Sequence, residues 1–224
     1  MPSASLSFFV GANMDPVAWL LLLALSMAPP EKAKSFPGYA ETVEQRTARY
    51  ASIARDIAAV VDAAPPLPNL DRPQSAALLL ALAAEETDLD LDADKGPCFH
   101  GVWQGRSWAW RCDGGRAVGL LQIHTHSTER AAMFADRPRV LRVGYRHLRR
   151  ALGARCRYED RLAVLASGCD HPRSVIGSRR VFALWHRAML TAAPAWPTRG
   201  RLDAAVATMT ATRHGARGDR CLAP

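Results

Sequence analysis

The segment at residues 76–89 constrains the fold more than any other part of the chain. It reads Ala-Ala-Leu-Leu-Leu-Ala-Leu-Ala-Ala-Glu-Glu-Thr-Asp-Leu and is apolar until it reaches Glu85 and Glu86. A helix that is apolar on almost every face must be buried on most sides. We therefore expect a central helix that starts near Asp71 and Pro73, ends near Glu86, and carries a carboxyl group out of the core.

A carboxyl group in that position has a chemical use. Burial in a cleft penalises the charged form and raises the pKa, so a glutamic acid can stay protonated near neutral pH and act as a general acid on a glycosidic oxygen. Glu85 and Glu86 are about 100° apart on a helix, so only one of them can point into a given cleft. The other would be a solvated charge, and the alternative for both is an ordinary charged helix end.

The remaining pattern predicts a mainly α fold with one domain of about 150 residues and no internal repeat. Apolar side chains recur at helical spacing in several segments. These segments are residues 39–64, 128–134, 137–152, 158–167 and 174–190. Residues 90–117 form a long loop rich in Gly and Trp, with short pieces of strand between Gly96 and Trp110. Loops of this length in compact domains are often binding elements.

The first residues resemble a targeting segment. Val17–Ala28 is a short apolar run that fits the hydrophobic region of a signal peptide better than a membrane span. No Lys or Arg precedes it, and an uncleaved anchor or an apolar tail is the alternative. We expect three parts: a targeting segment and linker at 1–38, the folded domain at 39–190, and a basic tail at 191–224.

The five cysteines bear on the compartment. We expect bridges Cys98–Cys112 and Cys156–Cys169, with Cys221 left over, as suits an oxidising compartment. Reduced, buried cysteines are the alternative. Two Cys-x-His pairs, which end at His100 and His171, also allow a metal site, but zinc sites usually have tighter spacings. We therefore expect no metal and no cofactor.

Charge is distributed unevenly along the chain. Residues 1–95 hold 7 basic and 13 acidic side chains, whereas residues 96–224 hold 22 arginines against 8 acidic side chains. The basic C-terminal half of the chain favours a polyanionic partner. The alternative is a solvated arginine-rich surface with no dedicated partner. No zinc-finger, helix-turn-helix or RNA-binding signature is present, so we expect no nucleic-acid partner.

Three segments together resemble a known family. Residues 84–90 close the apolar helix, residues 117–123 read Ala-Val-Gly-Leu-Leu-Gln-Ile, and residues 161–168 read Arg-Leu-Ala-Val-Leu-Ala-Ser-Gly. In this order they are similar to the soluble lytic transglycosylase domain and its goose-type lysozyme relatives, which show Glu-Ser-x-Phe, Gly-Leu-Met-Gln and Ala-Tyr-Asn-Ala-Gly. Here Thr87 stands for the serine and Leu165 for the tyrosine.

The resemblance implies a lysozyme-like helical domain that cleaves the β-1,4 bond between N-acetylmuramic acid and N-acetylglucosamine and forms a 1,6-anhydro product. It assigns catalysis to Glu86 and substrate binding to Thr87, Gly119, Leu120 and Gln122. A single carboxyl group can serve as acid and then as base. Most glycosidases need a second carboxylate, although substrate-assisted enzymes are an exception.

Other residues carry weaker hypotheses. Four alternating aspartates could bind calcium, although the segment lacks the glycine and terminal glutamate of an EF-hand. Two histidines could bind metal or sugar, and three tryptophans could stack on sugar rings or fill the core. These residues are Asp88, Asp90, Asp92 and Asp94, His124 and His126, and Trp103, Trp108 and Trp110.

The sequence therefore predicts an exported, periplasmic or secreted monomer that acts on peptidoglycan glycan strands, with transient or no membrane association. A non-catalytic peptidoglycan-binding or scaffolding protein of the same fold is one alternative. A hydrolytic lysozyme, which would release a reducing end, is another.

Overall fold

The computed structural model describes residues 14–32, 38–95, 99–104, 107–110, 117–124, 133, 136–191 and 196. Over these residues the protein is mainly α-helical, as the sequence predicted. In chain order the elements are α1 (Pro16–Met27), η1 (Pro30–Lys32), α2 (Val43–Ala63), α3 (Arg72–Thr87), α4 (Leu91–Lys95), β1 (Phe99–Gln104), β2 (Ser107–Trp110), β3 (Ala117–Val118), β4 (Ile123–His124), α6 (Arg137–Leu152), η3 (Tyr158–Leu165) and α7 (Pro172–Met189).

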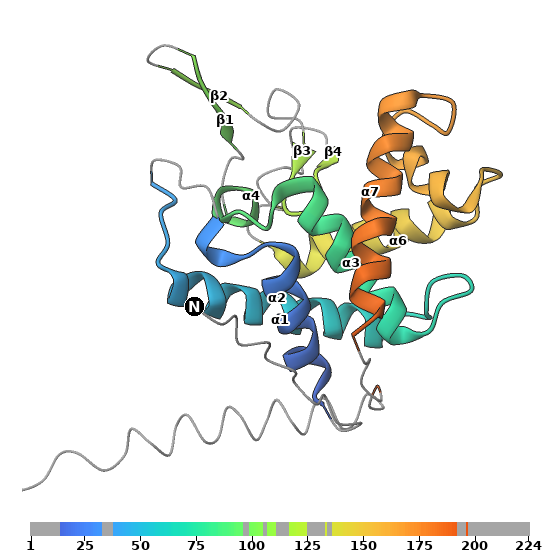
Figure 1. The fold of residues 1–224 in the computed structure, drawn as a ribbon, viewed down its shortest axis with the longest axis horizontal. Helices are drawn as coiled ribbons and strands as arrows, with labels where there is room; N and C mark the ends of the chain where they lie inside the picture. The colour runs from blue at the N-terminus through green and yellow to red at the C-terminus, as the bar shows by residue number, and fades with distance from the viewer. Residues whose placement is uncertain are drawn as a thin grey trace, which may run out of the picture.

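Helix α3 is the centre of the fold, with α1, α2, α6 and α7 around it (Figure 1). It starts at a capping box in which the Asp71 carboxylate accepts from the Gln74 backbone N–H at 2.8 Å, while the Gln74 side chain accepts from the Asp71 N–H at 2.9 Å. Every residue from Ser75 to Ala84 is buried. The prediction of a buried central helix is confirmed.

Helix α6 is amphipathic and joins the core through one face. Its buried residues include Leu141, Tyr145 and Leu148. From the second half of α6, the Tyr145 hydroxyl donates to the Pro65 carbonyl at 3.0 Å, and the Arg149 guanidinium donates to the same carbonyl. These bonds fix α6 to the turn that precedes α3.

Buried ion pairs fasten α2 and α6 to the segment after α3. The Arg49 side chain of α2 lies 3.7 Å from Asp94, and Arg46 lies 3.4 Å from the fully buried Asp90. Arg137 of α6 makes two bonds to Asp94, at 2.6 and 2.7 Å. A buried carboxylate is tolerated only when it is paired or otherwise compensated, so these arginines account for the burial of Asp90 and Asp94.

Helix α1 packs against α2 and α3. Its Trp19, Leu20 and Ala24 are fully buried, whereas Leu22 is 38% exposed. The Asp15 carboxylate caps its first turn by accepting from the Ala18 N–H at 3.0 Å. The apolar run that resembles a signal segment is therefore part of the core in this structure. Among the residues that the structure describes, no helix is long and apolar enough to cross a membrane.

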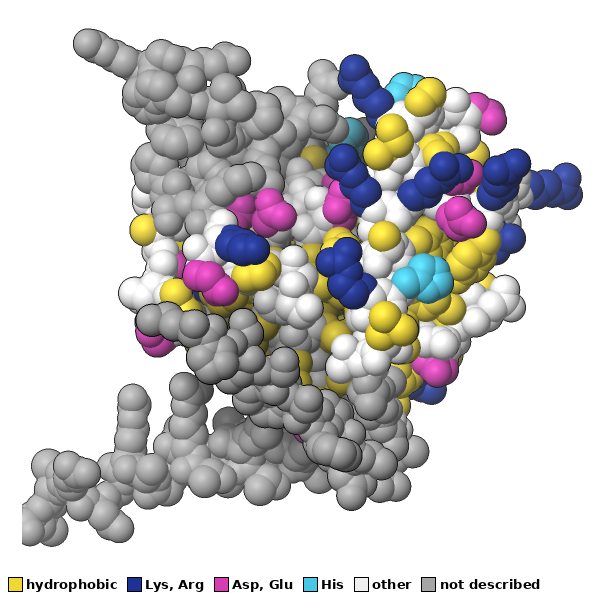
Figure 2. All heavy atoms as spheres, viewed as in Figure 1, with side chains coloured by type: hydrophobic (Ala, Val, Ile, Leu, Met, Phe, Trp, Pro, Cys, Tyr) yellow, Lys and Arg dark blue, Asp and Glu magenta, His cyan; other side chains and the backbone are white. Residues whose placement is uncertain are grey.

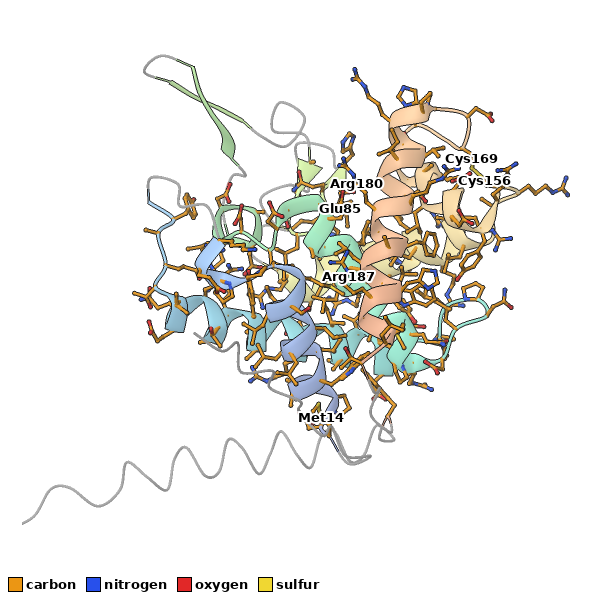
Figure 3. All side chains as sticks on the ribbon, viewed as in Figure 1. Met14, Glu85, Cys156, Cys169, Arg180 and Arg187 are labelled. Carbon is orange, nitrogen blue, oxygen red and sulfur yellow. A yellow bond between two sulfur atoms is a disulfide. The ribbon has the colours of Figure 1, made fainter. Side chains whose placement is uncertain are left out.

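The bridge between Cys156 and Cys169 is present, as predicted, with the two Cα atoms 6.2 Å apart (Figure 3). It encloses η3, in the segment at 158–167 where the sequence predicted a helix, and this helix is of the 3₁₀ type. The other predicted bridge, Cys98–Cys112, and Cys221 lie outside the described residues, as do His126 and nearly all of the predicted helix at 128–134 and of the tail at 191–224.

Two small antiparallel pairs stand beside the helices. β1 and β2 form a hairpin in which the Cα atoms of Trp103 and Trp108 are partners, within the loop where the sequence suggested short strands. β3 and β4 flank the Gly-Leu-Leu-Gln turn, with Val118 opposite Ile123. The second pair matters for the site because it closes the turn of the second motif.

Candidate active site

A cavity of about 620 Å³ opens where the end of α3, the β3–β4 turn, α6, η3 and α7 meet. Its lining brings together residues that are far apart in the sequence. They include Glu86, Gln122, His147, Leu165, His171 and Ser178. Figure 2 shows Lys and Arg side chains over α7 and the adjoining η3 segment, so part of the surface near the cavity is basic.

Glu86 reaches the cavity because α3 ends just after it. Asp88 and Leu89 both adopt left-handed backbone conformations, with φ of 52° and 53°, and turn the chain away from the helix axis. The Leu89 carbonyl then accepts from the Arg49 side chain at 2.8 Å, which holds the turn in place. The Glu86 side chain is exposed at this helix end. The helix therefore presents Glu86 to the cavity but does not bury it, contrary to what the sequence argument expected.

Glu85 behaves differently from the solvated charge that the sequence predicted. It is half-buried between α3 and α7, and one carboxylate oxygen lies 3.6 Å from Arg180 (Figure 3). Burial raises the pKa of Glu85, and the nearby Arg180 only partly offsets this effect. Glu85 is not among the residues that line the cavity. The expectation of a solvated Glu85 is wrong because α7 covers this face of α3.

Thr87 joins the first two motifs. Its side chain is fully buried, and its hydroxyl donates to the Ala83 carbonyl at 2.9 Å and lies 3.4 Å from the Leu120 carbonyl. It does not line the cavity. The structure therefore places Thr87 beneath the site as a link between α3 and the β3–β4 turn.

The β3–β4 turn has a geometry that needs glycine. Gly119 has a φ of +69°, and a Cβ there would lie 2.9 Å from a methyl carbon of Val140. The Gly119 carbonyl accepts from the Gln122 backbone at 3.1 Å and from its side-chain amide at 2.9 Å. Gly119 and Leu120 are buried, whereas Gln122 lines the cavity. Of the four predicted substrate-binding residues, only Gln122 faces the cavity.

The third motif also reaches the cavity. Leu165, at the position of the family tyrosine, lies at the end of η3, is 37% exposed and lines the cavity. The η3 segment is held by Ser178 of α7, whose hydroxyl accepts from the Leu162 N–H at 3.1 Å and donates to the Glu159 carbonyl at 2.6 Å. An apolar side chain therefore occupies the place where the resemblance expects a hydroxyl group.

Several lining residues were not singled out for the site from the sequence. His147 of α6 has its pKa lowered by burial and by the neighbouring Arg150 and Arg146, so its imidazole is mainly neutral near pH 7. His171 and Ser174 lie at the start of α7, with their Nδ1 and Oγ atoms 3.4 Å apart. The sequence signal for a role of these residues in this cavity is weak, because none of them belongs to the three family motifs and they come from α6 and from the start of α7.

The lining contains a single carboxyl group, that of Glu86, among the residues that the structure describes. In the same part of the chain, no group of three or more His, Cys, Asp or Glu side chains is arranged to hold a metal ion. The aspartates considered for calcium include Asp90 and Asp94, which pair with arginines. The arrangement suits acid–base chemistry by one carboxyl group or the binding of a polar polymer.

Comparisons with known proteins identify no relative. No family model matches the chain, and no curated protein or solved structure matches it significantly.

Proposed function

We propose that this protein is a lytic transglycosylase that cleaves the β-1,4 bond between N-acetylmuramic acid and N-acetylglucosamine in peptidoglycan. One observation carries the proposal. Three motifs that are separated in the sequence each contribute a side chain to one cavity, namely Glu86, Gln122 and Leu165. A chance match in three short motifs would not be expected to converge on one cavity.

In the proposed mechanism Glu86 acts twice. The protonated carboxyl group donates its proton to the glycosidic oxygen as the bond from that oxygen to C1 of the muramyl residue breaks. The resulting carboxylate then takes the proton from the O6 hydroxyl of the same residue, and O6 forms a new bond to C1. The products are a 1,6-anhydro sugar and a free hydroxyl on the leaving sugar, and Glu86 ends protonated. One carboxyl group is sufficient, because the substrate supplies the nucleophile.

Because Glu86 is exposed, the substrate must contribute to raising the pKa of its carboxyl group. A general acid works best when its pKa is near the operating pH, and removal of water from a carboxyl group raises its pKa. A sugar chain bound across the cavity would displace water from around Glu86. In this proposal, substrate binding provides the desolvation that the helix end alone does not.

Replacement of the acid tests the proposal. We expect Glu86→Gln to lose cleavage by about 10²–10⁴-fold, because glutamine keeps the shape but cannot donate or accept the proton. Glu85→Gln is the matched control and should retain cleavage, since Glu85 faces α7 outside the cavity. Mass spectrometry of digested peptidoglycan should show 1,6-anhydro ends. Reducing ends would indicate a hydrolytic lysozyme, and full activity of Glu86→Gln would contradict the mechanism.

A non-catalytic peptidoglycan-binding protein is the second candidate. Leu165 supports it, because a leucine in the cavity cannot donate the hydrogen bond that the family tyrosine would supply. In that case the purified protein would bind glycan strands through the same cavity without releasing soluble fragments. The digestion experiment separates the two candidates.

We propose a periplasmic or secreted location for the same protein. The Cys156–Cys169 bridge supports it, because disulfides persist mainly in oxidising compartments. We further propose that the protein works as a monomer, with transient or no membrane association and without a cofactor. Cell fractionation and the migration of the purified protein in size-exclusion chromatography test these points.

A further inference from the structure

A second cavity of about 520 Å³ lies next to the candidate active site. The two cavities share Ile123, His124 and His147, so they meet along the β4 strand and one side of α6. Among the described lining residues, Ile123 at the end of the second motif is the only motif residue in the second cavity, and the proposed reaction does not use this cavity. Its position beside the reacting centre is what a neighbouring part of a bound polymer would occupy.

Guanidinium groups line one wall of this second cavity. Arg139, Arg142 and Arg146 are spaced three and four residues apart on α6, so they project from the same face of the helix. All three are exposed. Within the part of the chain that the structure describes, Arg142 alone of the three has a carboxylate neighbour, Asp136 at 3.8 Å, and both of those side chains are exposed. The described lining contains no Asp or Glu.

Apolar side chains also line this cavity. Val60, Ala63 and Ala64 come from the end of α2, and Met133 lies with them. A cavity lined by both arginines and apolar side chains suits a carboxylate carried on a short, partly apolar substituent. Arginine is well suited to carboxylates because its planar fork can make two parallel hydrogen bonds.

We propose that this arginine cavity binds a carboxylate group of the wall glycan while the sugar chain lies across Glu86. The inference rests on the proposed function, since it takes the glycan as the ligand. Two sources carry this chemistry. One is the acidic stem peptide attached to the muramyl residue, and the other is the lactyl carboxylate that remains when the peptide is removed.

The test compares three soluble probes in a binding assay. They are glycan strands with stem peptides, the same strands after amidase treatment, and a neutral chitin oligosaccharide of similar length. The binding partner is the full chain with Glu86→Gln, so that no probe is cleaved. The pocket variant adds Arg139→Gln and Arg146→Gln. The matched control instead adds Arg150→Gln and Arg155→Gln, which remove the same charge from exposed positions outside both cavities.

We expect the pocket variant to bind peptide-bearing strands roughly fivefold to thirtyfold more weakly than the control variant at low salt, and less so at raised salt. Binding of the chitin oligosaccharide should be equal in both variants. An equal loss on amidase-treated strands would identify the lactyl carboxylate, whereas a loss confined to the intact strands would identify the peptide. Thermal unfolding of both variants serves as the control that each variant is folded.

Equal affinity of the two variants for every strand would refute carboxylate binding by the arginine cavity, and it would not bear on the proposed cleavage. If the wild-type protein releases no glycan fragments but the arginine dependence remains, the cleavage proposal falls and the carboxylate site stands. Absence of binding to all three probes would refute both. Tighter, arginine-dependent binding of a short DNA duplex would also refute the carboxylate site, because it would identify a nucleic-acid surface.

Discussion

Thr87 gives the sharpest test of how the motifs are joined, because the resemblance and the structure assign it different roles. Thr87→Val keeps the shape of the side chain but removes the hydroxyl that bonds Ala83 and lies 3.4 Å from the Leu120 carbonyl. A neutral hydrogen bond contributes a net 0.5–1.5 kcal/mol, and the longer contact should lie at or below the low end of that range. We expect a loss of about 1–2 kcal/mol in the free energy of unfolding, or a fall in Tm of about 2–8 °C.

Two measurements separate the roles. Thermal unfolding should show the loss for Thr87→Val and little change for Thr87→Ser, which keeps the hydroxyl. In the proposed function, the KM for peptidoglycan should change little in either variant, because the side chain is fully buried and does not line the cavity. An unchanged Tm together with a raised KM in Thr87→Val would refute this reasoning and restore the role in substrate binding.

Two further predictions concern the turn and the first helix. Gly119→Ala should destabilise the protein by about 2–4 kcal/mol, because the left-handed backbone is strained for alanine and the new Cβ would lie 2.9 Å from Val140. Chemical denaturation measures this change in the free energy of unfolding. An unchanged free energy of unfolding would contradict the prediction and show that the turn can shift. Deletion of residues 1–35 should cost about 5 kcal/mol, because it removes the apolar side chains that α1 buries against α2 and α3. A truncated protein as stable as the full chain would contradict the burial of α1.

The sequence was sufficient to predict the bounds of a helix where the apolar pattern and the capping residues agree. The predicted helix at 137–152 has the same bounds in the structure, because α6 has a strong apolar stripe, an Asp136 cap and a proline in its first turn. The type of helix at 158–167 was less clear, because a segment of fewer than three turns does not separate a period of 3.6 from the period of 3.0 in a 3₁₀ helix. Its bridge between Cys156 and Cys169 was predictable from the cysteine spacing.

Pairing between distant charges could not be predicted from the sequence. Arg46 and Arg49 have the spacing of a solvent-facing helix surface, yet both are buried because Asp90, Asp94 and Glu41 meet them there. The partners of Arg46 and Arg49 on the α4 side lie about forty residues away, and no local pattern links them. The partial burial of Glu85 was missed for the same reason, because it depends on packing against the distant helix α7.

The apolar segment before residue 28 shows how one composition can serve two structures. A signal segment and a buried helix both need a continuous apolar run, so hydropathy alone cannot separate them. In the structure Trp19 and Leu20 are fully buried, whereas Leu22 on another face is 38% exposed, as in a helix that packs on one side. A segment that a peptidase removes cannot also complete the core of the mature protein. The packing of α1 therefore favours the alternative in which this apolar segment is not cleaved, and the N-terminal sequence of the mature protein distinguishes the two.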